Sequence, residues 1–172
     1  MGKGLPRSMS RGAAARQEVI KQEFVIRGTV AVTATGAAVG FGTAVIGDLP
    51  EGNILLLGAV AYLSLAGSGA DPNLDATWDG DFSIGTAPTA DVTLSGGEID
   101  IIGSTALGAA TAEVSPRVRA VNGTQVIFDN TDNSLELNLN VLVDAANIVD
   151  NSTVNLTASG VLQLVYVVML DD

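Results

Sequence analysis

Residues 43–67 read TAVIGDLPEGNILLLGAVAYLSLAG, and this stretch decides the fold class. Pro50, with Gly47 and Gly52 on either side of it, marks a turn, so the stretch is typical of two long strands joined by a tight loop. Within residues 54–65 both the odd and the even positions are apolar, so neither face of the second strand is plainly solvated. One face can close a core. The other face of this strand must then be covered as well, either by another chain or by a folded-back segment of the same chain.

The composition excludes several kinds of site. The 172-residue length favours a single domain, and the chain contains no cysteine and no histidine, which excludes disulfides, thiolate sites and catalytic imidazoles. The longest apolar runs, 54–66 and 161–170, are shorter than the roughly 20 residues that span a bilayer. The start of the chain also lacks the apolar segment of a secretory signal. We therefore expect no membrane partner.

The charge is distributed very unevenly along the chain, whose formal net charge is −11. Residues 1–27 hold six of the eight basic side chains, whereas residues 28–172 hold two basic and seventeen acidic ones. This division predicts an N-terminal arm over 1–27, extended or with a short helix through 13–22, and a body over 28–172. The candidate residues for docking the arm on an acidic or grooved partner are Lys3, Arg7, Arg11, Arg16, Lys21 and Arg27.

A solvated tail is the alternative interpretation of the arm. Nucleic acid is not expected as a partner, because the arm has no aromatic residue before Phe24 and the acidic body would repel phosphate.

From Phe24 onward, strand patterns alternate with turns rich in Gly, Asn, Asp and Pro. About ten or eleven short strands are predicted, at 24–35, in the pair within 43–67, and at 76–84, 91–94, 98–102, 113–121, 124–128, 134–143, 153–158 and 161–170. This pattern predicts an all-β protein, a sandwich or a barrel. The β-sandwich of jelly-roll type, with an extra hairpin, is the most economical architecture.

Two late strands differ in their predicted exposure. Polar and apolar residues alternate in 134–143, which predicts one buried and one solvated face, whereas 161–170 is apolar on both faces, like 54–65. The two fully apolar strands are candidates for the centre of the sandwich and for an oligomer interface, although simple burial within one chain would also explain them. The candidate interface residues are Leu55, Leu57, Leu63, Leu164, Tyr166 and Val168.

Paired acids are candidate catalytic groups, because two carboxylates at a suitable separation hydrolyse glycosidic bonds. Glu98 and Asp100 would share one strand face, as would Asp79 and Asp81. The chain has only one Trp and two Tyr to serve as sugar platforms, so we expect no catalytic residues and no enzyme activity.

Several acids between Asp71 and Asp81 could in principle hold calcium through their carboxylate oxygens. Their spacing matches neither an EF-hand loop nor a nonapeptide repeat. We therefore interpret them as turn residues and expect no metal site, and no cofactor is expected either, since no glycine-rich loop precedes a helix.

In the order and composition of its segments, the whole chain resembles the decoration (cement) proteins of tailed-bacteriophage capsids. The resemblance is carried by the basic arm, by the Gly- and Ala-rich body containing GDLPEGNILLLG at residues 47–58, and by a last strand opened by SGV at 159–161. It implies a jelly-roll-like body, frequently a homotrimer, on the outer surface of the virion capsid. It further implies that the arm lies across major capsid proteins and that the protein stabilises the capsid by bridging these subunits.

The competing class is a β-sandwich adhesion or fibre module on a virion or a cell surface. Electron microscopy of purified particles would distinguish the two classes.

Overall fold

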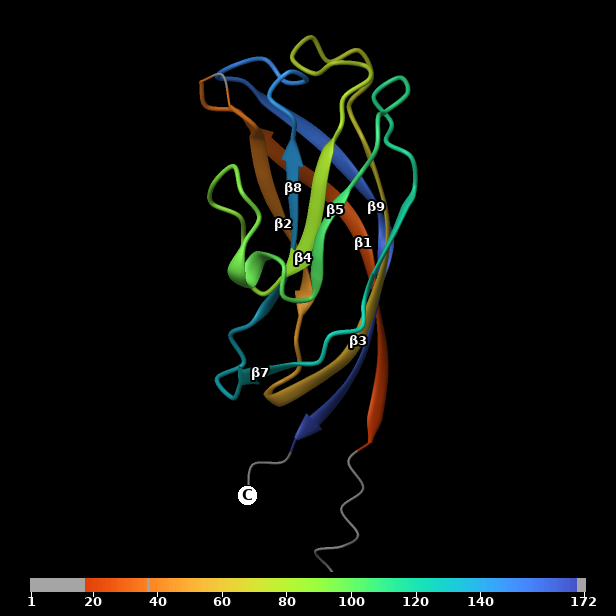
Figure 1. The fold of residues 1–172 in the computed structure, drawn as a ribbon, viewed down its shortest axis with the longest axis vertical. Coiled ribbons are helices and arrows are strands. Elements are labelled where there is room, and N and C mark those ends of the chain that lie inside the picture. The colour runs from red at the N-terminus through yellow and green to blue at the C-terminus, as the bar shows by residue number, and fades with distance from the viewer. Residues whose placement is uncertain (1–17, 37, 170–172) are drawn as a thin grey trace, which may run out of the picture.

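The computed structural model describes residues 18–36 and 38–169 (Figure 1). These residues form β1 (Val19–Thr33), β2 (Gly40–Asp48), β3 (Gly52–Ala66), β4 (Gly80–Gly85), the 3₁₀ helix η1 (Gly96–Glu98), β5 (Ile102–Ala106), β6 (Val118–Asn122), β7 (Val126–Asn130), β8 (Glu136–Val143) and β9 (Thr153–Met169). The all-β class predicted from the sequence is confirmed. Across the described ranges, no helix is long and apolar enough to cross a membrane.

Every neighbouring strand pair is antiparallel, and the strands follow the order β5-β4-β8-β2-β1-β9-β3-β6. The strand β7 pairs with the first part of β3, below β6. The two ends of this order, β5 and β6, come close together, and the Asn122 side chain donates a hydrogen bond to the carbonyl oxygen of Ile101 (2.9 Å). The sheet is therefore nearly closed into a barrel.

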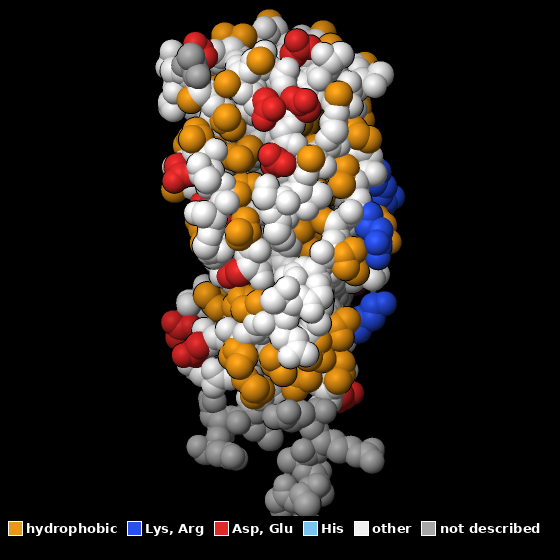
Figure 2. All heavy atoms as spheres, in the orientation of Figure 1, with side chains coloured by type: hydrophobic (Ala, Val, Ile, Leu, Met, Phe, Trp, Pro, Cys, Tyr) orange, Lys and Arg blue, Asp and Glu red, His pale blue; other side chains and the backbone are white. Residues whose placement is uncertain are grey.

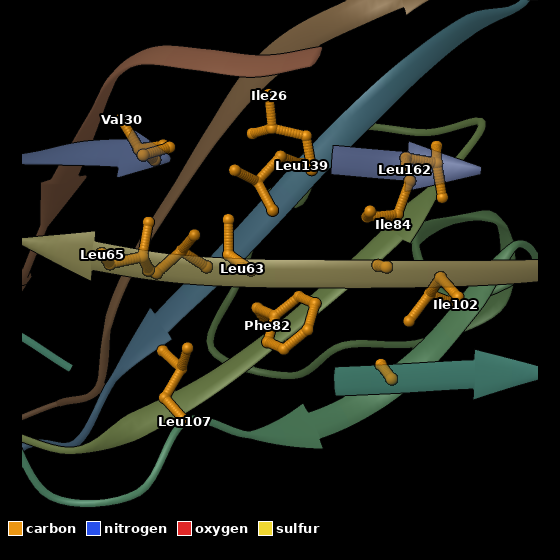
Figure 3. Close-up of a cluster of buried hydrophobic side chains, with 14 of the residues drawn as sticks. Ile26, Val30, Leu63, Leu65, Phe82, Ile84, Ile102, Leu107, Leu139 and Leu162 are labelled. Atoms are coloured by element: carbon orange, nitrogen blue, oxygen red, sulfur yellow. The ribbon is translucent and has the colours of Figure 1, made fainter. Parts of the chain in front are cut away.

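The core lies between two layers of this sheet, with β1, β9, β3 and β6 in one layer and β2, β8, β4 and β5 in the other. Figure 3 shows Ile26, Val30, Leu63, Leu65 and Leu162 of the first layer with Phe82, Ile84, Ile102 and Leu139 of the second, all almost completely buried. Trp78 is also fully buried, as the predicted alternation with Phe82 and Ile84 requires.

The N-terminal boundary differs from the prediction. β1 begins at Val19 and pairs with β9 over its whole length, so residues 19–27, assigned to the arm, belong to the sheet. The predicted helix through 13–22 is wrong for residues 19–22, because their β-branched residues and their pairing partners favour a strand. Residues 1–17 lie outside the described part of the chain.

Two predicted strands, 91–94 and 98–102, are replaced by a loop over residues 86–101 that contains η1. This loop covers the outer side of β8. Asn140, predicted to be solvated, is 0% exposed; its Oδ1 accepts from Thr89 N (2.8 Å), and its Nδ2 donates to the carbonyl oxygens of Ala87 (3.0 Å) and Glu98 (3.2 Å). The predicted solvated face of this strand was therefore wrong, since a polar side chain can be buried when its hydrogen bonds are satisfied.

The last two predicted strands, 153–158 and 161–170, form one continuous strand, β9. The junction at Ser159–Gly160 remains paired on both sides, with β1 and with β3. β9 and β3, the two strands predicted to be central, are therefore direct neighbours in the middle of the first layer.

Candidate interaction surface

The predicted interface residues lie on two different sides of the sheet. Leu63 and Leu164 are 0% exposed and Tyr166 is 3% exposed, because all three side chains face the core of a single chain. They are not available to a partner, so this part of the predicted interface is corrected. Val168 also faces inward, and it is half-buried against the core.

Leu55 and Leu57 face outward, and a β-bulge in β3 explains the division. In the pairing with β9, Leu56 lies opposite Tyr166 and Gly58 lies opposite Val165, so Leu57 is one extra residue. The alternation therefore shifts by one position. Odd-numbered residues before the bulge point outward, whereas odd-numbered residues after it point into the core. A period of two without the bulge would place the odd-numbered residues before and after it on the same side of the strand.

The outward residues at the lower end of the first layer are mostly apolar. We call this surface the apolar outer face, and it comprises Val19 and Val25 of β1, Val161 and Val165 of β9, Leu55, Leu57 and Val60 of β3, Val121 of β6 and Ile127 of β7. Four of these side chains are more than half exposed: Val19 (58%), Val25 (56%), Val121 (55%) and Ile127 (64%). Cross-strand pairing joins the residues into one surface, since Val25 lies opposite Val161 and Leu55 lies opposite Ile127.

The same layer carries ordinary solvated residues at its upper end. The outward residues in the first part of β9 are Thr153, Asn155, Thr157 and Ser159, all exposed. Beyond Gly160 the outward positions become Val161, Gln163 and Val165. Because one strand changes from polar to apolar on the same face, the apolar half is a local feature rather than a general property of this sheet.

A hollow of about 410 Å³ lies in the apolar outer face beside the bulge. It exists because β6 pairs with β3 over Ala59–Leu63 and β7 pairs over Gly52–Leu56, so neither strand continues beside Leu57 and Gly58. Its lining includes Leu57, Val60, Val121 and Val165, with Lys21 at its side. The hollow is therefore suited to an apolar side chain of a partner.

Basic side chains border the apolar outer face. Arg117 and Arg119 both lie over the ring of Tyr62, with 5.5 and 6.0 Å from the guanidinium carbon to the ring centroid, and Arg119 Nε also donates to the Tyr62 hydroxyl (3.2 Å). Lys21 and Arg27 are exposed outward residues of β1. All four Lys and Arg side chains of the described residues therefore belong to this side, and Figure 2 shows basic side chains along one edge.

Of the six predicted arm residues, Lys21 and Arg27 lie in β1, and Lys3, Arg7, Arg11 and Arg16 lie outside the described residues. The sequence interpretation did not connect Arg117 and Arg119 with this surface. Their spacing of two was an available signal, because residues two apart in a strand share one face.

The acids between Asp71 and Asp81 serve mainly as turn residues. Asp71 Oδ1 accepts from Asn73 N (2.9 Å), and Asp75 Oδ1 accepts from Thr77 N (2.9 Å) and Thr77 Oγ1 (2.9 Å). These bonds to Thr77 hold the pKa of Asp75 below its usual value. Within the described residues, no group of three or more His, Cys, Asp or Glu side chains is arranged to hold a metal ion.

Asp79, Asp81 and Asp144 line a hollow of about 170 Å³ at the upper end of the second layer. Although Asp144 is exposed, partial desolvation of its carboxyl, and then the nearby carboxylates of Asp79 and Asp81, raise its pKa above the usual value. The ionised form of Asp144 is therefore disfavoured in the folded protein.

We expect Asp144→Asn to raise the melting temperature at pH 7. A carboxyl whose pKa is raised on folding binds its proton more tightly in the folded protein, so its unfavourable effect develops as the pH rises through the raised pKa. The gain in melting temperature from Asp144→Asn should therefore vanish at a pH below the ordinary pKa of aspartate. Thermal unfolding at both pH values tests this, with the exposed Asp150→Asn as control, and equal gains at both would contradict it.

The acids considered as a catalytic pair fasten the loop 86–101 instead. Glu98 Oε2 accepts from Ser95 N (2.7 Å) at the start of η1. Asp100 accepts from Thr86 N (3.0 Å) and Thr86 Oγ1 (2.6 Å), while burial raises its pKa. Both carboxylates therefore hold the conformation of this loop.

Comparison with solved structures finds seven chains that match, whereas comparison with protein families and curated proteins finds none. A chain of the solved cyanophage Pam1 capsid asymmetric unit is similar with 19% sequence identity and a TM-score of 0.41, over 91% of this chain and 96% of that chain. This value describes a loose likeness, and we base no functional conclusion on it.

Proposed function

We propose that the chain is a structural protein of a viral particle, which binds the outer surface of an icosahedral capsid and stabilises it by bridging major capsid subunits. The observation that carries the proposal is the apolar outer face with its basic border, a surface of the kind that the subunits of an assembly bury against one another. Contiguous exposed apolar surface is rare on monomeric proteins and marks contact with another macromolecule. The carboxylates of Asp71, Asp75, Glu98 and Asp100 serve turns and loops, so this surface is the strongest functional feature of the body.

We further propose that the body is a jelly roll, the architecture that the sequence favoured. If β7 is set aside as an extra strand, the first of eight strands pairs with the last, the second with the seventh, the third with the sixth and the fourth with the fifth. This nested pairing supports the proposal, because a jelly roll arises when a long antiparallel hairpin is wound into two sheets. Viral capsid domains and lectins both use this fold, so the fold alone does not select a function.

The stabilising effect would follow from mass action. A protein that binds assembled shells but not free subunits stabilises each site by RT ln(1 + [L]/Kd), about 2.7 kcal/mol at a hundredfold excess over Kd. In this proposal the body is a homotrimer and the arm adds contacts to major capsid proteins through Lys3, Arg7, Arg11 and Arg16. Surface ion pairs contribute only about 0 to 1 kcal/mol each, so the arm would act through several contacts together.

Deleting residues 1–17 should weaken binding to purified capsids by at least about tenfold, or ~1.4 kcal/mol. The deletion ends before β1, so the described body is retained. Co-sedimentation of the intact and shortened chains with capsids at moderate salt measures the change. A variant with Lys3, Arg7, Arg11 and Arg16 all replaced by Gln is the matched control for charge.

Equal binding of the intact and shortened chains would show that the arm is a solvated tail. If the intact chain does not bind capsids at all, the proposed function is wrong, and the adhesion or fibre module becomes the better interpretation.

A further inference from the structure

We propose that the apolar outer face of one copy docks on an acidic corner of a second copy, in a head-to-tail contact that repeats around a closed ring. This inference rests on the self-association within the proposed function and specifies its interface. The acidic corner consists of the exposed side chains of Asp48, Glu51, Asp132 and Glu136. The proposed contact requires no partner other than a second copy of the chain.

The acidic corner is formed where β2 ends and β8 begins. Asp48 lies directly opposite Glu136 in the β2–β8 pair, and Leu49 N donates to the carbonyl oxygen of Leu135 (3.1 Å). The Asn130 side chain donates to the carbonyl oxygens of Leu49 (3.0 Å) and Pro50 (2.9 Å), which holds the β2–β3 turn beside the β7–β8 loop. Neighbouring like charges repel one another, so this corner favours a basic partner.

Four cations outnumber the acids Glu23 and Asp129 on the side of the apolar outer face, so this side favours a cover that is not basic. Residues 1–17 of the same chain would bring four further cations to a side that already carries Lys21, Arg27, Arg117 and Arg119. A twofold contact of the face with itself would bring these four cations against their own equivalents. Both the cover by residues 1–17 and the twofold contact would bring like charges together. An acidic surface would instead complement the basic side chains.

The positions of the two surfaces determine the kind of contact. Asp48 and Glu136 lie on the outer side of the β2–β8 pair, in the second layer, whereas the apolar outer face is the outer side of the first layer. In Figure 2 basic side chains line one edge, and acidic side chains lie at the lower part of the other edge. Two different surfaces of one chain form a heterologous contact, which generates a ring when the rotation closes. The mode of assembly is therefore a cyclic oligomer, and the proposed homotrimer is one such ring.

An apolar side chain next to the acidic corner fits the hollow. Val45 of β2 is 53% exposed and precedes Asp48 by three residues. It lies opposite Asn138, one of the outward residues of β8, and therefore faces the same side as Asp48 and Glu136. In the proposed contact Val45 enters the hollow of about 410 Å³ lined by Leu57, Val60 and Val121, while Arg119 approaches Glu136.

Sedimentation velocity of the full-length chain over a range of concentrations tests the contact. The parent chain should associate, whereas Val121→Glu and Val45→Glu should each weaken association by at least about tenfold, because each buries a carboxylate in an apolar contact. Val149→Glu, at an equally exposed valine outside both surfaces, should associate like the parent. Thermal unfolding of each variant verifies that its fold is retained.

A charge exchange distinguishes the head-to-tail contact from a twofold one. Arg119→Glu and Glu136→Arg should each weaken association, and the double variant should recover at least half of the loss in binding free energy. A parent chain that stays monomeric at every concentration would overturn the inference. So would a Val45→Glu chain that associates normally, or a double variant that fails to recover.

Capsid binding is measured separately on the same proteins. A monomeric chain that still binds capsids would contradict the interface proposed here and leave the proposed function standing. An oligomeric chain that does not bind capsids would contradict the proposed function and leave the interface proposed here standing.

Discussion

Gly160→Ala should destabilise the protein severely, lowering the free energy of unfolding by about 3 kcal/mol or more. A Cβ atom at this position would collide with the carbonyl oxygen of Tyr62 and lie 3.1 Å from Leu63 Cα. These are backbone atoms of β3, which is paired with β9 on one side and with β6 on the other, so they cannot move without breaking a ladder. Urea unfolding of the parent and variant measures the difference.

Gly103→Ala is the matched control. Its added Cβ would meet no heavy atom within 4 Å, and Gly103 also lies in a strand, β5. Because Ala restricts the unfolded chain more than Gly does, this change should be neutral or stabilise the protein by up to about 1 kcal/mol. Similar losses for both variants would show that the close approach of β9 to β3 is not the cause.

Much of the fold could be predicted from the sequence, because the decisive signals are local. The turn around Pro50 separates two strands as expected, and the alternation of Trp78, Phe82 and Ile84 correctly places these side chains in the core. The two strands that are apolar on both sides are indeed the central neighbours β3 and β9.

The errors arose where long-range contacts decide the structure. Gly160 suggested a break between strands, but pairing on both sides keeps β9 continuous. Asn140 suggested solvent exposure, but the loop 86–101 supplies backbone partners for its amide. The residues that pair with Gly160 and those that bond to Asn140 all lie far away in the sequence, so no local sequence pattern could reveal these contacts.

The candidate surface was predictable only in part. Leu55 and Leu57, two of the predicted interface residues, lie on the outward face, but the period of two also grouped Leu63 with them, because a bulge adds one residue without a clear sequence signal. Arg117 could have been found from its spacing to Arg119. The acidic corner could not, because Asp48 and Glu136 are brought together only by the β2–β8 pairing.

The buried carboxylate of Glu113 was missed as well, and it leads to the second large expected effect. Glu113 is 3% exposed; Oε2 accepts from Gly69 N (2.9 Å) and Oε1 accepts from Asp71 N (2.8 Å). Its backbone is equally committed, because its carbonyl oxygen accepts from Trp78 Nε1 (3.0 Å) and from Gly67 N (2.9 Å). One residue therefore organises the loop between β3 and β4.

Glu113→Ala should lower the free energy of unfolding by about 2 to 4 kcal/mol, because two loop N–H groups lose a charged acceptor and a cavity remains. The loss should be concentrated in residues 67–78. The bond from Trp78 to the backbone carbonyl does not need the side chain, so the core below should keep its packing. Urea unfolding gives the total loss, and hydrogen exchange should show faster exchange at Gly69 and Asp71, with the exposed Asp150→Ala as control. Unchanged exchange at these two amides would mean that the carboxylate does not hold the loop.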